Sequence, residues 1–503
     1  HARDRTAADP LVIIGGHVAS NPEPIADFID AAVLGDGEAI VTAISQTLRA
    51  GKQAGWSRQE MLVRLACEPP TRGRVYVPSL YDVTYLGDHT IAAVTPNQAG
   101  VPERVAKNTI SNLDDWPYPK HPLVPIAETV HERYSVELFR GCLRGCRFCQ
   151  AGMTTRPVRE RSAEGIAQMV ADGLAATGYD EVGLLSLSSA DHSQIGLIAA
   201  QLAGCYAPAN ISLSLPSTRV DAFNIELAQQ LSAGGRRSGL TFAPEGGSER
   251  IRRVINKNVD EADLIATVEA AFQAGWRSLK LYFMAGLPTE TEADVAAIGA
   301  LARRVIDAGR AVTGQRDIAC TLSIGAFVPK PHTSFQWVAQ WDVETVNQRL
   351  RDLKESIRAD RRYSRAISVK YADARPAQIE GLLARGDRRL GRVIEAVWRA
   401  GGIFDGWSEH FSYDRWLGVA NRVLAERGLN VDWYTTRERS GAETLPWDHL
   451  DVGLDRDWLW EDYQASLAAQ SLADCRWAGC HDCGVCPGLG LAIELAETSG
   501  GGQ

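Results

Sequence analysis

The stretch ELFRGCLRGCRFCQAGMTTRPVRER, residues 137–161, places three cysteines within eight residues and six arginines around them. Cys142, Cys146 and Cys149 follow a C-x3-C-x2-C spacing, and three cysteines cannot all pair in disulfides. A closed structural zinc site normally takes four ligands. In a cubane [4Fe-4S] cluster each iron usually binds one thiolate, so three cysteines leave one iron open. The spacing therefore predicts an iron–sulfur cluster with an open position, with zinc or three unlinked thiols as the alternative.

Strand and helix patterns alternate around and after this stretch. Candidate strands span residues 135–140, 181–188, 211–215, 238–243, 277–285 and 319–327, and candidate helices span 163–176, 193–203, 223–233, 260–273 and 291–309. This alternation predicts βαβ units and a parallel sheet, in a partial (β/α)6 barrel of the α/β class. The chemistry of such barrels lies at the carboxyl ends of the strands, and the cysteine loop directly follows the first strand.

The segment before the barrel predicts part of a second α/β domain. Residues 11–40 show a strand, a glycine turn, a short helix, a second strand and another glycine turn, and a helix at about 38–50 follows. This is half of a doubly wound domain, in which glycine turns line ligand crevices. Because the chain starts at His1, directly before a strand-like run, we expect further residues to precede it.

We therefore expect six segments along the chain. They are a partial doubly wound domain (1–65), an irregular proline-rich connector (66–134), the barrel (135–342), a mainly helical region (343–470), a four-cysteine segment (471–490) and a flexible tail (491–503).

Composition narrows the function classes. No stretch approaches the roughly 18 apolar residues that a membrane-spanning helix needs, and no signal peptide is evident. The formal net charge of −9 argues against a protein that coats nucleic acids. Ten cysteines in 503 residues are sparse for a disulfide scaffold, and seven of them lie in two clusters. This usage indicates metal ligation in a reducing cytoplasm.

The second cluster lies in the stretch DCRWAGCHDCGVCPG, residues 474–488, and consists of Cys475, Cys480, Cys483 and Cys486. Four ligands close a metal site, so this one is expected to relay electrons or stabilise structure and not to bind a cosubstrate. The cysteine–proline step at its end favours an auxiliary [4Fe-4S] cluster, and structural zinc is the alternative.

The three-cysteine loop after the first barrel strand resembles the radical SAM superfamily. In that superfamily the open iron chelates S-adenosylmethionine (SAM), and one electron from the cluster cleaves it to methionine and a 5′-deoxyadenosyl radical. SGLTFAPEGGSERIRRVINK (238–257) and LKLYFMAGLPTETEADV (279–295) resemble the fourth and fifth strand segments of methylthiotransferases and their relatives. By this resemblance the expected SAM-site residues are Phe148, Ser188, Ser189, Glu245, Ser248, Arg250 and Gly286. Ser188 and Ser189 stand where the superfamily often carries Gly-Gly-Glu, so hydroxyls would replace the usual contact.

Other stretches narrow the resemblance. GGHVASNPEPIADFIDAAVLGDGE (15–38), FVPKPHTSFQW (327–337) and LPWDHLDVG (445–453) resemble a bacterial family that joins a cobalamin-binding-like domain to a radical SAM core. The turns that would flank cobalamin contain Gly15, Gly16, Gly35, Gly37 and Glu38. Whether the domain binds cobalamin or only covers the core stays open.

Four residues are candidate substrate contacts: Arg156 and Arg159 near the cluster loop, and Lys330 and His332 after the sixth strand. Ion pairs with rim carboxylates, or loop capping, are their structural alternatives. No catalytic residue is assigned beyond the cluster ligands.

We predict a cytoplasmic, oxygen-sensitive radical SAM enzyme that methylates, thiolates or rearranges its substrate, reduced by a reductase, flavodoxin or ferredoxin. RNA or a translation component is the first substrate hypothesis, supported by the methylthiotransferase resemblance and the arginines. A small metabolite, tetrapyrrole or lipid is the second, and the acidic charge supports it. A non-catalytic electron-transfer or redox-sensing protein is the third.

Overall fold

The computed structural model describes residues 1–215 and 240–489. The helix expected at 223–233, the start of the strand expected at 238–243 and the tail at 491–503 lie outside the described residues.

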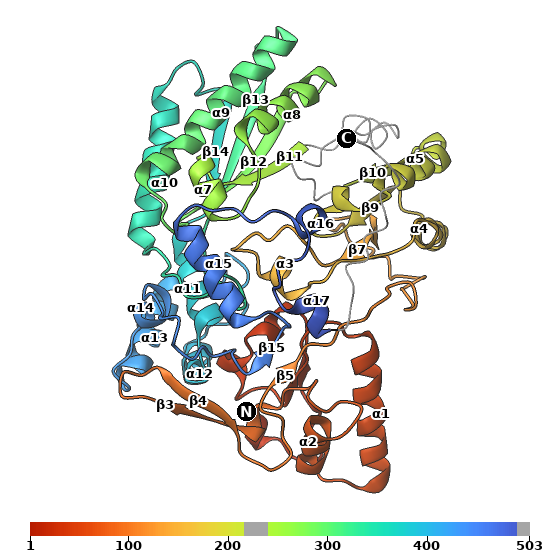
Figure 1. The fold of residues 1–503 in the computed structure, drawn as a ribbon, viewed down its shortest axis with the longest axis vertical. Coiled ribbons are helices and arrows are strands. Elements are labelled where there is room, and N and C mark those ends of the chain that lie inside the picture. The colour runs from red at the N-terminus through yellow and green to blue at the C-terminus, as the bar shows by residue number, and fades with distance from the viewer. Residues whose placement is uncertain (216–239, 490–503) are drawn as a thin grey trace.

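Parallel strands form the centre of the molecule (Figure 1). One sheet has the order β10-β9-β6 and contains β6 (Tyr134–Glu137), β9 (Glu181–Leu185) and β10 (Ser212–Ser214). The other has the order β11-β12-β13-β14 and contains β11 (Leu240–Glu245), β12 (Ser278–Ala285), β13 (Ala319–Ala326) and β14 (Ile367–Tyr371). Every pairing within the two sheets is parallel, which confirms the predicted α/β partial barrel. Strand β14, a short edge strand between two helices, was not predicted from the sequence.

Helices flank these sheets. They are α4 (Ala163–Thr177), α5 (Ile195–Tyr206), α7 (Glu249–Val254), α8 (Glu261–Gln273), α9 (Glu292–Thr313) and α10 (Val343–Ala359). Figure 1 shows α4 and α5 beside β9 and β10, and α8, α9 and α10 around the four-stranded sheet. Helix α9 begins with a capping box between Thr291 and Asp294 and ends at Gly314, whose φ is +67°.

The N-terminal domain carries the predicted parallel pair, β1 (Ile13–Ile14) with β2 (Ala31–Ala32). The short helix expected between them consists of two 3-10 segments, His17–Ser20 and Glu23–Ile25. The helices α1 (Glu38–Ala54) and α2 (Arg58–Cys67) follow.

The segment expected to be an irregular connector contains regular structure. Strands β3 (Tyr81–Tyr85) and β4 (Ile91–Pro96) form an antiparallel hairpin, and β5 (Val105–Ala106) pairs in parallel with β15 (Leu450–Asp451). The sequence YDVTY alternates polar and apolar residues, but the surrounding prolines and glycines hid this period in the sequence analysis.

The C-terminal region is mainly helical, as predicted. Its helices are α11 (Ala374–Arg385), α12 (Leu390–Arg399), α13 (Tyr413–Ala425), α14 (Val431–Thr435), α15 (Arg456–Leu467), α16 (Cys475–Ala478) and α17 (Val485–Gly488).

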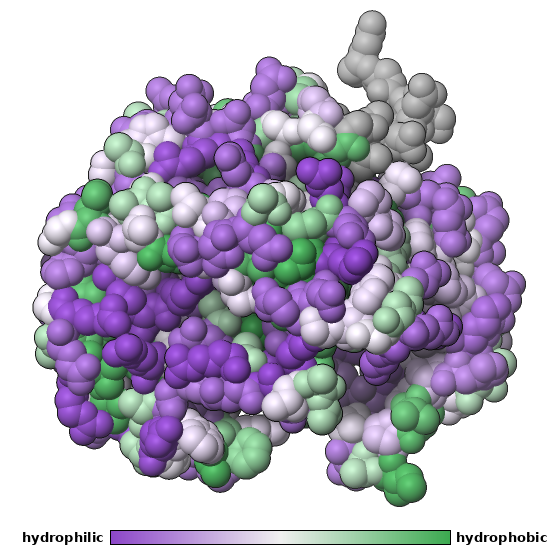
Figure 2. Space-filling model, turned by 90° about the horizontal axis from the view of Figure 1, so that it is seen from below, coloured by the Kyte–Doolittle hydropathy of each residue, from purple (hydrophilic) through white to green (hydrophobic). Residues whose placement is uncertain are grey.

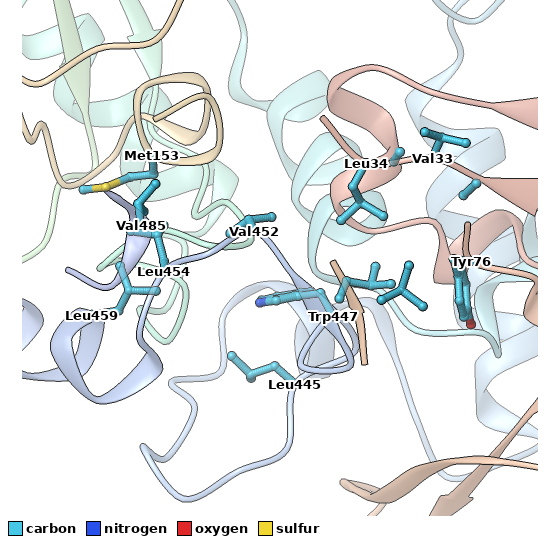
Figure 3. Packing of buried hydrophobic residues seen from close by; sticks show 14 of the residues in the cluster. Val33, Leu34, Tyr76, Met153, Leu445, Trp447, Val452, Leu454, Leu459 and Val485 are labelled. Atoms are coloured by element: carbon cyan, nitrogen blue, oxygen red, sulfur yellow. The ribbon is translucent and has the colours of Figure 1, made fainter. Parts of the chain in front are cut away.

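One hydrophobic cluster joins three distant parts of the chain (Figure 3). Leu34 of the N-terminal domain, Trp447 before β15 and Val485 of α17 belong to it, together with Met153 behind the three-cysteine loop. Because these residues share one core, the N-terminal domain, the cluster loop and the C-terminal segment hold one another in place.

The face seen in Figure 2 is mostly hydrophilic, with hydrophobic residues scattered across it. Over the described ranges, no helix is both long and apolar enough to cross a bilayer.

Candidate functional site

The three-cysteine loop leaves the barrel after β6 and the short strand β7 (Phe139–Arg140), and it ends at α3 (Gln150–Thr154). Gly141 has φ +97°, and a Cβ at this position would lie 2.3 Å from the backbone oxygen of Pro157. Only glycine fits such a site without a shift of the chain. Cys149 caps α3, because its Sγ accepts a hydrogen bond from the backbone N–H of Gly152 at 3.3 Å.

Two neighbouring elements hold the loop from outside. The buried Arg147 guanidinium donates from Nε and Nη2 to Asp462 of α15, at 2.9 and 2.8 Å. The Arg147 backbone N–H donates to Ile255, at the end of α7, at 3.1 Å. The Asn256 amide donates to the backbone oxygen of Gly145 at 3.0 Å. These hydrogen bonds therefore fix the path of the three-cysteine loop.

Burial makes two of these thiols, Cys142 and Cys149, poor acids in the metal-free chain. It raises the pKa of Cys142 to about 12, and the neighbouring Cys146 adds to the effect. Burial also raises the pKa of Cys149, while the Lys257 cation opposes this shift. Thiols that are neutral at pH 7 become thiolates when a cationic metal centre binds them. The donor set thus fits a metal centre.

The described part of the chain brings no three of its His, Cys, Asp and Glu side chains within reach of one metal ion. In a cubane each thiolate binds a different iron, so its sulfurs need not converge on one point.

The two predicted serines at the end of β9 have different surroundings. Ser188 is buried and lines a small pocket together with Cys142 and Arg144. Within the described ranges its Oγ has no hydrogen-bond partner. The Oγ of Ser189 donates to the backbone oxygen of Leu184 at 2.9 Å. Ser188 is therefore the better placed of the two for a ligand at the cluster loop.

Glu245 stands at the end of β11 with φ +66°, and its Oε1 lies 3.7 Å from the Lys257 amine. Both charges act on the Cys149 thiol, so Glu245 lies near the three-cysteine loop, and its contact with SAM stays a prediction. Phe148 is partly buried against the shared hydrophobic core.

Ser248 and Arg250 connect α7 to α9 by contacting Asp294. The Oγ of Ser248 caps α7 by accepting from the Ile251 N–H at 3.2 Å, and it also donates to Asp294. Arg250 pairs with the same Asp294 and donates to the backbone oxygen of Thr289 at 2.8 Å. Their contact with SAM stays a prediction.

The Gly286 turn is built around a carboxyl group that the sequence analysis missed. The N–H of Gly286, where φ is +91°, donates to Oε2 of Glu290 at 2.6 Å. Burial raises the pKa of Glu290 to about 7, although the N–H groups of Gly286 and Leu287 lower it. A titratable group therefore lies behind the Gly286 turn of the predicted SAM site.

A cavity of about 1120 Å³ lies between the N-terminal domain and the barrel. All five predicted cobalamin residues line it: Gly15, Gly16, Gly35, Gly37 and Glu38. Residues in and beside the three-cysteine loop also line it, among them Phe139, Gly141 and residues 154–156. This volume exceeds the range of about 300–1000 Å³ that is usual for small-molecule sites. The glycine turns and the start of the cluster loop therefore face one cavity.

Charged groups hold the two walls of this cavity together. Asp36 pairs with Arg140, at 2.9 Å, and with Arg159. Burial opposes ionisation of Asp36, but the two arginines hold its pKa below the usual range. Lys107, also missed by the sequence analysis, is buried beside the cavity and donates to Thr154 and Arg156 backbone oxygens at 3.1 and 2.6 Å. Burial lowers the pKa of Lys107 to about 8.

The other predicted substrate residues lie elsewhere. Lys330 pairs with Glu380 and does not line the described cavity. His332 is buried, and its Nε2 lies 2.9 Å from the backbone oxygen of Ser20. Burial lowers the pKa of His332 to about 4, so it is neutral at pH 7.

The four C-terminal cysteines meet at one small pocket next to the three-cysteine loop. Cys475, Cys480, Cys483 and Cys486 line it together with Leu143 and Arg156. Val485 belongs to the same hydrophobic cluster as Met153 of α3, and Figure 3 shows the two side by side. The structure thus brings together two cysteine groups that are more than 300 residues apart in the sequence.

Five of the six arginines around the loop have carboxylate partners: Arg140 with Asp36, Glu38 and Glu137, Arg144 with Asp191 and Asp474, Arg147 with Asp462, Arg159 with Asp36, and Arg161 with Asp114 and Glu137. Arg156 is the exception in the part of the chain that the structure describes. More of the six arginines form ion pairs with carboxylates than the sequence suggested.

Comparison with known proteins gives related sequences and folds. An uncharacterized protein of Methanocaldococcus jannaschii, MJ0966, is 27% identical over 308 residues, 61% of this chain and 63% of that protein. The alignment thus spans less than two thirds of that relative. The methyltransferase TsrM of Kitasatospora setae, solved with cobalamin and a [4Fe-4S] cluster, is 14% identical with a TM-score of 0.44, over 74% of this chain and 77% of that one. The cobalamin-dependent SAM radical enzyme OxsB, solved with aqua-cobalamin, is 12% identical with a TM-score of 0.40, over 91% and 71%.

Two protein families match parts of this chain. Residues 1–78 match the N-terminal domain of radical SAM proteins, and residues 136–302 match the radical SAM superfamily. The second match contains all three cysteines of the loop and the glycine turn at Gly286. Residues 136–302 therefore form a radical SAM domain, and residues 1–78 precede it as the N-terminal domain that matches radical SAM proteins.

Proposed function

We propose that this radical SAM enzyme binds a corrinoid in the large cavity and methylates a small organic molecule. The cavity itself carries the proposal, because the glycine turns predicted to flank cobalamin and the start of the three-cysteine loop both line it. A cluster-bound SAM would supply a 5′-deoxyadenosyl radical, and a corrinoid would supply a methyl carrier.

The protein's own groups suit such a pair of cofactors. Gly35 has φ +79°, and a Cβ there would lie 2.1 Å from the backbone oxygen of Asn108. The glycine keeps the turn close to its neighbour and leaves its other side open to the cavity. On α1, Val41, Ile44 and Leu48 add an apolar wall that would exclude water from a large planar ring.

The pairing of the arginines supports a small substrate over RNA. Phosphate groups bind to arginines whose donors are available, and five of the six arginines near the loop already have carboxylate partners. We further propose a reducing cytoplasm as the site of action and reduced flavodoxin or ferredoxin as the electron donor.

The first experiment tests SAM cleavage. The protein is reconstituted anaerobically with iron and sulfide, then given SAM and dithionite, and 5′-deoxyadenosine is measured. We expect its formation in the wild type and its loss in Cys142→Ala. A loaded cluster without any 5′-deoxyadenosine would instead support the electron-transfer or redox-sensing function.

The second experiment tests the corrinoid. Hydroxocobalamin binding is followed by its visible spectrum in Val41→Trp and in Gln46→Trp as the control. Both positions are exposed on α1, but only Val41 lines the cavity. We expect Val41→Trp to weaken binding at least about tenfold, or 1.4 kcal/mol, and Gln46→Trp to leave it unchanged. Equal binding in both variants would remove the corrinoid from this cavity.

The third experiment tests the substrate class. RNA and small-molecule fractions are each added to the SAM assay. Faster 5′-deoxyadenosine formation with RNA alone would favour the methylthiotransferase-like alternative.

A further inference from the structure

The guanidinium of Arg156 lies between the two cysteine groups. Its Nη2 lies close to Gly145, in the three-cysteine loop, because a Cβ built on this glycine would be 3.5 Å from it. On the other side, Arg156 lines the pocket formed by the four C-terminal cysteines. Leu143 lines this pocket as well as the small pocket of Cys142, so the two cysteine groups share a wall.

Among the residues that the structure describes, Arg156 is a buried cation without a counterion. It is 4% exposed, and its Nε has no hydrogen-bond partner in the same part of the chain. No carboxylate in residues 1–215 or 240–489 pairs with it, and its aromatic neighbour is Trp458, whose ring centre is 5.7 Å away. A buried charge without a counterion is unfavourable, and an anion at the same place would offset that cost.

Arg156 therefore borders the pocket of Cys475 and Cys486 and also lies beside the three-cysteine loop. A metal centre held by thiolates carries net negative charge, so one guanidinium can attract both centres when they are loaded.

We propose that Arg156 is a positioning residue shared by the two metal centres, where it offsets their negative charge and sets their reduction potentials together. The inference rests on the proposed function only for the identity of the three-cysteine cluster. Under this proposal the C-terminal metal centre acts beside the three-cysteine loop and is not a separate structural zinc site. Neighbouring Arg159, which pairs with Asp36, has no such role at the four-cysteine pocket.

The test compares Arg156→Gln with Arg156→Lys and Arg159→Gln. Midpoint potentials are measured by anaerobic redox titration followed by electron paramagnetic resonance, with iron and zinc counted in each protein. Removing a nearby cation disfavours the reduced state, so Arg156→Gln should shift the three-cysteine cluster to more negative potential, and the C-terminal centre likewise if it contains iron. Arg156→Lys should keep most of the wild-type potential, and Arg159→Gln should leave the C-terminal centre unchanged.

Chelator challenge gives a readout for the C-terminal site whether it holds iron or zinc. We expect Arg156→Gln to release that metal at least about tenfold faster than wild type, and Arg156→Lys to release it at nearly the wild-type rate. Unchanged potentials and release rates in Arg156→Gln would overturn the proposal. So would an effect on one centre only, or a loss of corrinoid binding with both centres unaffected. None of these readouts needs SAM cleavage, so the failure of the proposed function would be seen separately.

Discussion

The two cysteine sites lie next to each other but are built differently. The three-cysteine loop continues from a barrel strand, turns at a glycine that admits no side chain, and is fixed by Arg147 and Asn256. The four-cysteine segment consists of two single-turn helices and connecting turns, with Cys480 exposed and Cys483 buried in the shared core. We therefore expect the fold to shape the first site before any metal binds, and the second site to depend more on the metal itself.

The largest expected effect separates the two sites by activity. Cys142→Ala should lower 5′-deoxyadenosine formation more than about 100-fold, because the cluster loses one of three ligands. Cys480→Ala should remove the C-terminal metal but leave cleavage driven by dithionite within about threefold of wild type, because dithionite can reduce the first cluster directly.

The assay is single-turnover SAM cleavage with iron counted in each variant. Equal loss of cleavage in the two variants would show that the sites act as one unit.

The next effect concerns stability. Arg147 and Asp462 form an ion pair that is almost completely buried. Arg147→Met leaves a buried carboxylate, so we expect a loss of about 3–5 kcal/mol in the free energy of unfolding. At the second site, Arg144 lies 3.4 Å from Asp474, and both are partly exposed. Asp474→Asn should cost less than about 1 kcal/mol.

Urea denaturation of the metal-free proteins measures both changes. A double variant, Arg147→Met with Asp462→Leu, should recover part of the loss, because it removes both buried charges. Similar losses in Arg147→Met and Asp474→Asn would contradict the difference between the sites.

A smaller effect comes from two glycines. Gly141 and Gly479 both have positive φ, +97° and +83°, but only Gly141 has a backbone atom where a Cβ would be. Gly479→Ala should cost about 1 kcal/mol from backbone strain alone. Gly141→Ala must also displace the loop, so we expect a larger loss and less iron at the first site. Thermal melting and iron analysis measure both, and equal iron content in the two variants would contradict the predicted rigidity of the loop.

The same contrast explains what the sequence could predict. The spacing of Cys142, Cys146 and Cys149, and the strand before them, are local features, so both the site and the barrel were evident. The location of the second site beside the first was not, because it depends on packing between Val485 and Met153, which are far apart in the chain. Lys107 and Glu290 were missed for the same reason: their burial, and not their local pattern, makes them unusual.

The individual arginines show a further limit. Six arginines near a cluster suggested an anionic ligand, yet their partners come from several elements, such as Asp36 of the N-terminal domain and Asp462 of α15. The number of arginines can be read from the sequence, but their carboxylate partners depend on the fold. Only the structure distinguishes Arg156 from its neighbours.

The last expected effect is about as small for each residue as that of Gly479→Ala, depends on pH, and concerns the core that both cysteine sites contact. His332 and His449 are buried beside this core, and burial lowers the pKa of each to about 4. Below the unfolded pKa of about 6.5, the unfolded chain binds a proton that the folded chain does not, so stability falls as the pH falls from 6.5 toward 4. Each histidine should cost roughly 1 kcal/mol between pH 7 and pH 5.5.

Urea denaturation of the metal-free protein at the two pH values measures this loss, without a contribution from metal ligands. His449→Gln should remove about half of the stability loss that the two buried histidines cause. His410→Gln, at an exposed position, should leave this loss unchanged. Both cysteine sites contact the core beside these histidines. Because Arg147 and Asn256 also fix the three-cysteine loop, acid should loosen the four-cysteine segment first. Hydrogen exchange at pH 5.5 would show faster exchange in residues 480–489 than in residues 141–154, and the reverse order would contradict the comparison.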